Sequence, residues 1–285
     1  MNVTVLGAGT MGAGIAQACL TAGHTVTLFD AYPEALPAAQ DRIAKGLARA
    51  AEKGKLDHGS PEDLLAALHL ISSDLIEAVA EAGIVIEAVS EAPSIKEEVW
   101  RTVGPAAPSD ALLCSNTSSL SIGHLGEVSG QADRFCGLHF FNPVAVLPLV
   151  EVVEAAATSP ATLEAAESFA RGIGKTPVRC KDQPGFLVNR LLVPYLNQAI
   201  VLLQEGAADA TSIDTAMTLG ANMPMGPLAL ADLVGLDVVL AIMETLEREL
   251  NDPAYTPADL LVEKVRAGAL GRKTGQGFHS YGGDA

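Results

Sequence analysis

His139 and Glu151 are two titratable residues that stand out against apolar neighbours. Glu151 lies within the run LVEVV (149–153), and His139 lies between Leu138 and Phe140. A carboxylate among apolar side chains is costly unless it is paired, and a histidine is a suitable partner. Such a pair forms a general acid or base that works near neutral pH. The pattern alone is equally compatible with a structural role for both residues, in which His139 is a hydrogen-bonded core histidine and Glu151 lies on an edge strand.

A second polar group, SNTSS (115–119), follows the apolar strand pattern of residues 111–114. It therefore comes at the carboxyl end of a strand, where open α/β sheets bind ligands. Asn189 comes early in the first long helical pattern after the predicted sheet. Serines and threonines in such segments also serve as turn or cap residues, and this alternative stays open. No G-x-S-x-G motif occurs, so the nucleophile elbow of α/β hydrolases is excluded.

A glycine motif connects the first strand pattern to the first helical pattern, in the segment Gly7-Ala8-Gly9-Thr10-Met11-Gly12. Gly7 permits a tight turn, Gly9 lets the backbone approach a pyrophosphate, and Gly12 permits close packing of helix and strand. The helix N-terminus offers free N–H groups to the phosphates. Asp30 ends the second strand pattern, where its carboxylate can bind ribose hydroxyls and repel a 2′-phosphate. The motif predicts binding of NAD in preference to NADP.

The chain carries a formal charge of −16, which disfavours nucleic acid and anionic membranes as partners. Within this acidic chain, a helical pattern presents cations at spacings of three and four residues, at Arg42, Lys45, Arg49 and Lys53. This stripe is a candidate site for a phosphorylated ligand, although a solvated helical face has the same pattern.

The dispersed cysteines and histidines show no metal-ligand spacing, so no metal is expected. We find no membrane span or signal peptide and expect a cytoplasmic protein.

The elements that position these residues divide the chain in two. Up to residue 183, β-branched runs alternate with helical patterns, which predicts an α/β, Rossmann-type, doubly wound and mostly parallel sheet. From residue 184 to 285 the spacing is helical throughout, at 186–205, 212–219, 228–250 and 257–267. We therefore predict an NAD-binding domain at 1–183 and an all-helical domain for substrate binding and dimerisation at 184–285.

Together these motifs resemble the 3-hydroxyacyl-CoA dehydrogenase family, and most of all its short-chain 3-hydroxybutyryl-CoA members. The glycine motif is followed in family order by SNTSSL (115–120), LHFFNPV (138–144), LVEVV (149–153), PGFLVNR (184–190), MGPL (225–228), DLVGLD (232–237) and LGRKTGQGF (270–278). The whole set is far more specific than any one motif. The chain departs from the family pattern at Gly46, where a serine beside coenzyme A is common, at Ala92 and at Met223.

The resemblance implies roles for individual residues. His139 is implied as the general base, Glu151 as the residue that orients it, and Ser118 and Asn189 as hydrogen-bond partners of the substrate. It implies cofactor contacts for Ser118 and also for Glu91, Lys96, Asn142 and Lys273, and a coenzyme A contact for Lys53. It also implies an acyl-CoA substrate and a homodimer. The rival hypotheses are a dehydrogenase of a 3-hydroxy acid without coenzyme A and a non-catalytic NAD-binding protein.

Overall fold

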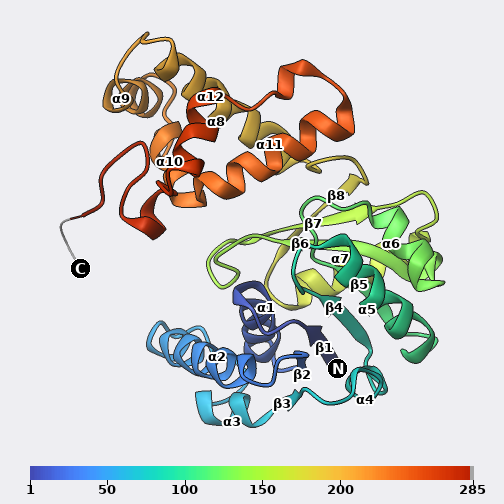
Figure 1. Cartoon of the computed structure of the whole chain (residues 1–285). Coiled ribbons are helices and arrows are strands. Elements are labelled where there is room, and N and C mark those ends of the chain that lie inside the picture. The colour runs from blue at the N-terminus through green and yellow to red at the C-terminus, as the bar shows by residue number, and fades with distance from the viewer. Residues whose placement is uncertain (283–285) are drawn as a thin grey trace. The chain divides into compact units, whose positions relative to one another are not determined.

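The computed structural model of the chain describes residues 1–282. It consists of two compact units, Met1–Gln183 and Pro184–Ala285 (Figure 1). The division falls between Gln183 and Pro184. The NAD-binding role of the first unit and the substrate-binding and dimerisation role of the second remain predictions.

The first unit is built on one eight-stranded sheet in the order β3-β2-β1-β4-β5-β6-β7-β8. The β6–β7 pair is antiparallel and the other pairs are parallel, which confirms the predicted doubly wound, mostly parallel sheet. The strands are β1 (Asn2–Leu6), β2 (Thr25–Phe29), β3 (Leu68–Ile71), β4 (Ile84–Glu87), β5 (Leu112–Ser115), β6 (Phe135–Phe140), β7 (Leu149–Glu154) and β8 (Thr176–Lys181).

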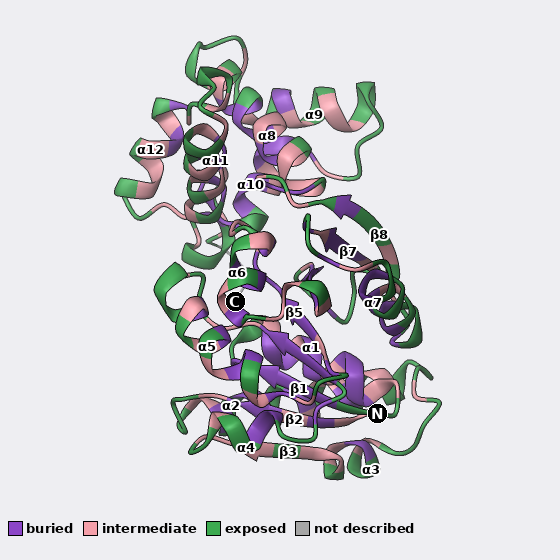
Figure 2. Cartoon of the chain, turned by 90° about the vertical axis from the view of Figure 1, so that its right-hand side faces the viewer, coloured by how far each residue is buried: buried purple, intermediate pink, exposed green. Residues whose placement is uncertain are grey.

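Helices cover both faces of this sheet, as continuous apolar strands require. They are α1 (Thr10–Thr21), α2 (Ala35–Glu52), α3 (Pro61–Ala66), α4 (Leu75–Val79), α5 (Pro93–Ala106), α6 (Ile122–Ser129) and α7 (Pro160–Gly172), with a short 3₁₀ helix at Ala132–Arg134. The inner strands β4 and β6 are buried along their whole length, and Figure 2 shows the centre of the sheet enclosed between the helices.

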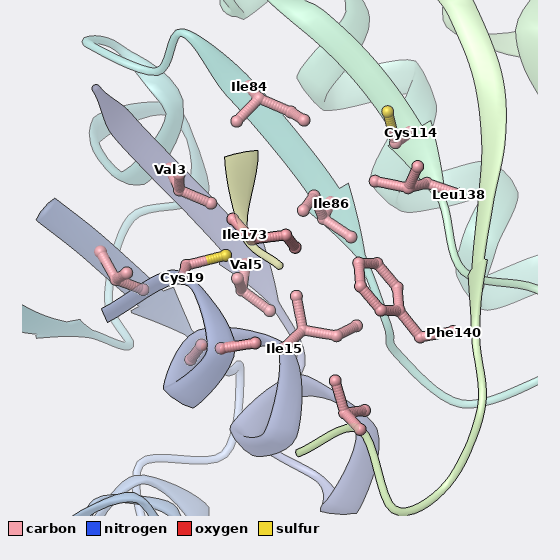
Figure 3. Packing of buried hydrophobic residues seen from close by; sticks show 14 of the residues in the cluster. Val3, Val5, Ile15, Cys19, Ile84, Ile86, Cys114, Leu138, Phe140 and Ile173 are labelled. Carbon is pink, nitrogen blue, oxygen red and sulfur yellow. The ribbon is translucent and has the colours of Figure 1, made fainter. Parts of the chain in front are cut away.

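Alternation along the strands separates the two faces. On one face Val5, Ile86 and Leu138 pack with Ile15 of α1 and Ile173 after α7 (Figure 3). The opposite face packs against α4, α5 and α6. There Thr4 donates to the carbonyl of Ala78 over 2.8 Å, the rings of Trp100 and Phe135 meet edge to face at 4.6 Å, and Ile122 lies over Gly137. His139 shares this second face with Phe135 because side chains alternate along β6.

Several short elements between residues 61 and 129 were not predicted from the sequence. They are α3, β3, α4 and α6. Each is too short to show a clear periodicity, and β3 is an edge strand that is only partly buried. Strand β3 nevertheless pairs with β2 in parallel, as a doubly wound sheet requires.

The second unit is helical, as predicted. Its helices are α8 (Val188–Gln204), α9 (Ala210–Gly220), α10 (Pro227–Val234), α11 (Leu236–Leu250) and α12 (Asp259–Arg266), with 3₁₀ turns at Pro253–Tyr255 and Arg272–Thr274. Their core includes Leu196, Ile200, Leu228 and Met243. The prediction of one helix over 228–250 is wrong, because the chain turns between α10 and α11 at Gly235, whose φ of +102° favours glycine.

Buried Asp232 at the end of α10 fixes the C-terminal segment of this unit. Its carboxylate accepts hydrogen bonds from the backbone N–H groups of Phe278 and His279, each at 2.9 Å, and from the hydroxyl of Tyr281 at 3.0 Å. The motifs around 232–237 and 270–278 therefore meet within one unit, although they are far apart in the sequence.

Candidate active site

His139 and Glu151 form a buried pair on adjacent strands. The register of β6 and β7 places the two residues directly opposite each other. Nδ1 of His139 lies 2.7 Å from Oε2 of Glu151, and the residues are only 3% and 0% exposed. The pairing predicted from the apolar surroundings is therefore present. The imidazole thereby gives the Glu151 carboxylate a hydrogen-bond partner, which its apolar strand does not supply.

The second ring nitrogen of His139 faces the loop after β5. Ser118 Oγ lies 2.9 Å from His139 Nε2. Because the Glu151 carboxylate accepts, we assign the imidazole proton to Nδ1, which leaves Nε2 as an acceptor for the Ser118 hydroxyl. The arrangement presents a basic nitrogen toward Ser118 with a carboxylate behind it. Such a geometry is suited to proton transfer.

Glu91 anchors the Ser118 loop. Its Oε1 atom accepts from Thr117 Oγ1 at 2.5 Å, from the N–H groups of Ser118 at 2.8 Å and Ser119 at 3.1 Å, and from Ser119 Oγ at 3.0 Å. Burial alone would raise the pKa of Glu91, but the Lys96 charge and the hydrogen bonds from Thr117 and Ser118 outweigh it and hold that pKa below its ordinary value. Glu91 is thus an anion that orders the loop.

Asn116 ties the same loop to the strand that carries His139. Its Oδ1 atom accepts from the backbone N–H of Phe140 over 2.8 Å. The loop is therefore fixed on both sides, to Glu91 and to β6.

Glu87, at the end of β4, is a site residue that sequence reasoning missed. Its carboxylate accepts from Lys96 Nζ at 2.6 Å, from the N–H of Val89 at 2.9 Å and from Ser115 Oγ at 2.7 Å. It is fully buried. The signal that could have found it resembles the one used for Glu151: a carboxylate that directly follows apolar residues of a buried strand.

The glycine loop has the shape that a dinucleotide requires. Gly7 has a φ of +103°, and a Cβ atom there would lie 2.6 Å from the carbonyl oxygen of Ala88. A Cβ on Gly12 would lie 1.8 Å from the carbonyl oxygen of Gly7, so the helix can approach the turn only with glycine here. Nothing lies within 4 Å of a Cβ on Gly9, which leaves open space for a pyrophosphate. Thr10 and Met11 open α1 directly after it.

Asp30 and Arg42 flank the loop at Ala8. Asp30 accepts from the N–H of Ala8 at 2.7 Å and from that of Tyr32 at 2.9 Å. Arg42 Nη2 donates to the carbonyl of Ala8 over 3.1 Å. The first cation of the predicted stripe is therefore attached to the glycine loop, whereas Lys53, directly after α2, is exposed.

The remaining predicted residues are spread over both units. The structure brings Ser118, His139, Glu151, Glu91 and Lys96 together within the first unit. Asn142, also in this unit, is exposed in the connection after β6. In the second unit Asn189 lies in the first turn of α8, and Lys273 forms an ion pair with Asp237 at 2.5 Å.

Gly46, which stands where the family commonly has a serine, lies against the side chain of Gln17. A Cβ atom on Gly46 would lie 2.0 Å from Oε1 of Gln17 on α1. The Gln17 side chain therefore occupies the space in which a serine side chain would stand.

Three further properties of the described residues concern the cysteines, metal ligands and membrane-crossing helices. Cys19, Cys114, Cys136 and Cys180 are all free and buried, and burial raises the pKa of the Cys19 thiol to about 12. Among residues 1–282, no group of three or more histidine, cysteine, aspartate or glutamate residues could hold a metal ion. Over the same residues, no helix is both long and apolar enough to cross a membrane.

A Rossmann-type sheet that carries a dinucleotide loop and a buried histidine–carboxylate pair on neighbouring strands is typical of nicotinamide-dependent oxidoreductases. The chain belongs to the 3-hydroxyacyl-CoA dehydrogenase family. The family's NAD binding domain matches residues 2–183 and its C-terminal domain matches residues 185–281. NAD is accordingly its cofactor, and the rival hypothesis of a non-catalytic NAD-binding protein is set aside.

Individual relatives agree with this assignment. A probable 3-hydroxybutyryl-CoA dehydrogenase of Deinococcus radiodurans is 43% identical over 281 residues, which cover 99% of this chain and all of that protein. The crystal structure of (S)-3-hydroxybutyryl-CoA dehydrogenase from Ralstonia eutropha superposes with a TM-score of 0.93 at 42% identity, covering 99% of both chains. A diketoreductase that acts on dicarbonyl compounds superposes with a TM-score of 0.86 at 34% identity, again covering 99% of both chains.

Proposed function

We propose that this enzyme interconverts 3-hydroxyacyl-CoA, in particular 3-hydroxybutyryl-CoA, and 3-oxoacyl-CoA, with His139 as the general base. The observation that carries the proposal is the chain of contacts from Ser118 Oγ to His139 Nε2 and from His139 Nδ1 to Glu151. These contacts leave His139 Nε2 unprotonated, so that it can accept a proton, and place the Glu151 carboxylate where it stabilises the imidazolium that forms.

In the oxidation direction, His139 Nε2 takes the proton of the substrate's 3-hydroxyl group. Glu151 accepts a hydrogen bond from Nδ1 throughout, so it stabilises the imidazolium that forms. Bound NAD⁺ supplies the acceptor for the hydride that leaves C3. A positioned base of this kind contributes roughly 10²–10⁴-fold to the rate. In the reverse direction the same nitrogen returns the proton.

Other residues hold the reactants. Ser118 and Asn189 are proposed to hydrogen-bond the substrate's oxygens, and exposed Lys53 to bind a phosphate of coenzyme A. The loop of Gly7, Gly9, Thr10, Met11 and Gly12 fits the pyrophosphate, and Asp30 keeps lone pairs for ribose hydroxyls beside its two backbone donors. Glu91, Lys96, Ser118, Asn142 and Lys273 complete the proposed set of cofactor contacts.

The serine–histidine–glutamate geometry also raises the possibility of a serine hydrolase. Hydrolysis of a thioester needs N–H donors that face the developing oxyanion. In this loop, the N–H groups of Ser118 and Ser119 both donate to the Glu91 carboxylate. These two N–H groups are therefore engaged by an anion and are not available to an oxyanion, so the site favours proton transfer over acyl transfer.

A dehydrogenase of a substrate without coenzyme A is the second candidate. The observation that favours it is the similarity to a diketoreductase. The higher identity to the 3-hydroxybutyryl-CoA dehydrogenases and the exposed cations of α2 support a coenzyme A thioester instead.

We also propose that two copies of the chain associate. The second unit leaves large apolar side chains exposed, including Leu191 of α8 at 74% and Leu219 of α9 at 82%. Association with a second copy would bury side chains of this kind. Light scattering after size exclusion measures the mass, and a monomer at micromolar concentration would contradict this part of the proposal.

The decisive experiment follows NADH absorbance with acetoacetyl-CoA, with free acetoacetate, and with NADPH in place of NADH. Oxidation that requires both NADH and the thioester supports the proposed reaction. Turnover of the free acid at a comparable kcat/KM supports the second candidate. Release of free coenzyme A without NADH oxidation would indicate the hydrolase.

A further inference from the structure

Lys175 is a half-buried cation that the proposed mechanism does not use. It lies in the turn between α7 and β8. Its Nζ atom donates to the backbone carbonyl of Val144 and, over 2.9 Å, to that of Leu147. Both acceptors belong to the connection of residues 141–148 between β6 and β7. Because one ammonium group donates to two carbonyls of the same segment, Lys175 attaches the β6–β7 connection to the α7–β8 turn at two points.

The backbone around Lys175 is itself hydrogen-bonded on both sides. Gly174, with a φ of +74°, follows the end of α7, and the N–H of Lys175 donates to the carbonyl of Ala170 over 2.9 Å. The next residue, Thr176, donates its N–H to the carbonyl of Pro148 over 2.8 Å. The main chain therefore ties the turn to the last residue of the connection, and the Lys175 side chain reaches further back into it.

The β6–β7 connection also lies against the helix that follows the glycine loop. Val144 is 4% exposed, and a Cβ atom on Gly14 of α1 would lie 3.0 Å from its side chain. Asn142, a proposed cofactor contact, comes two residues before Val144. Because the connection begins at the carboxyl end of β6, it lies at the edge where open α/β sheets bind their ligands. Hydrogen bonds that fix the carbonyl of Val144 therefore also limit where Asn142 can lie.

We propose, on the basis of the proposed function and its assignment of Asn142, that Lys175 is a positioning residue for the dinucleotide. It acts through the carbonyls of Val144 and Leu147, which fix the β6–β7 connection, and the connection holds Asn142 ready for the cofactor. Without these two hydrogen bonds, Asn142 is ordered only when the cofactor binds, and the entropy lost in this ordering lowers the affinity.

The test measures NADH binding in Lys175→Met, which keeps the aliphatic stem and removes the ammonium group. Because the acceptors are carbonyls, the substitution leaves no buried charge without its partner. We expect the NADH Kd, measured by fluorescence titration, to rise roughly five- to tenfold, the affinity that one hydrogen bond typically supplies. Asn142→Ala should raise it by a similar factor. At saturating NADH, kcat with acetoacetyl-CoA should change little, because the strands β6 and β7 hold His139 and Glu151 themselves.

A double-mutant cycle with Asn142→Ala shows whether the effect passes through Asn142. If it does, Lys175→Met raises the NADH Kd by no more than about twofold in the Asn142→Ala background, whereas independent effects would multiply. Lys181→Met is the matched control, because Lys181 ends the strand β8 that follows Lys175 and its side chain is 69% exposed in an ion pair with Glu154. This control should leave the NADH Kd unchanged.

Hydrogen exchange supplies a readout that requires neither turnover nor cofactor. The N–H groups of Val146 and Leu147 both donate to the carbonyl of Pro143 within the connection, at 2.9 and 3.0 Å. They should exchange faster in Lys175→Met, while the strand amides of β1 keep their protection.

The binding and exchange results would stand even if the enzyme proved inactive on every acyl-CoA, which would refute only the proposed function. An unchanged NADH Kd in Lys175→Met would overturn the proposal. Unchanged exchange at Val146 and Leu147 would overturn it as well, and so would the same fold-change of Kd in both backgrounds of the cycle.

Discussion

His139 and Glu151 are direct cross-strand partners in the antiparallel β6–β7 pair of the sheet. Directly opposite residues of an antiparallel pair place their side chains on the same face and within contact distance. The short connection of residues 141–148 enforces this arrangement, because a parallel return would need a longer crossover. The reversal of β7 is thus what brings the carboxylate against the imidazole, while parallel β5 delivers Ser118 to its other nitrogen.

Replacement of His139 by glutamine should abolish most of the activity without loss of cofactor binding. We expect kcat to fall roughly 10²–10⁴-fold, because the base is lost while the polar contacts of an amide partly remain. The NADH Kd should stay close to the wild-type value. His124→Gln is the control, since His124 also pairs with a glutamate, Glu97, but is exposed on α6. Unchanged turnover in His139→Gln would remove His139 as the base.

Replacement of Lys53 by glutamate tests the coenzyme A site. We expect KM for acetoacetyl-CoA to rise by about tenfold and kcat to change little, because one phosphate contact is replaced by repulsion worth about 1 kcal/mol or slightly more at an exposed site. Arg171→Glu makes the same change of charge on α7 and should not alter KM. If KM is equally insensitive to both substitutions, a substrate without coenzyme A becomes the better hypothesis.

The parts of the fold that sequence predicted well are those with strong local signals. The glycine motif, the long apolar strands and the pairing of His139 with Glu151 each follow from neighbouring residue types. The break at Gly235 was missed because glycine within an apolar helical pattern does not reveal whether its φ is positive. Glu87 carries a comparable signal, a carboxylate after apolar strand residues, but its partners Lys96 and Ser115 come from two other elements, and only the folded sheet shows that they meet.

Replacement of Asp30 by serine should weaken the preference for NADH over NADPH. The carboxylate accepts two backbone hydrogen bonds and would lie beside a 2′-phosphate, which it repels. We expect the ratio of kcat/KM values for NADH and NADPH to fall by at least about tenfold, roughly 1.4 kcal/mol. The neighbouring exposed residue Glu34 offers the control Glu34→Ser. An unaltered ratio would show that Asp30 does not determine cofactor choice.

Replacement of Glu91 by glutamine should destabilise the protein in a pH-dependent way. The pKa of Glu91 lies below its ordinary value in the folded protein, because the Lys96 charge and the hydrogen bonds from Thr117 and Ser118 outweigh the effect of burial. Its contribution to stability is therefore complete above the unfolded-state pKa of about 4.3 and is lost as pH falls through the folded-state value.

We expect the free energy of unfolding of Glu91→Gln to be about 1 kcal/mol below that of the wild type at about pH 7, a modest figure because the Glu91 side chain is 43% exposed and partly screened. The difference should shrink as the pH falls below about 4, in denaturant titrations at several pH values. Glu98→Gln, an exposed glutamate of the same helix α5, is the control and should show no such trend. A difference that stayed constant from neutral to acidic pH would mean that Glu91 holds the Ser118 loop by shape and hydrogen bonding alone, and not by its charge.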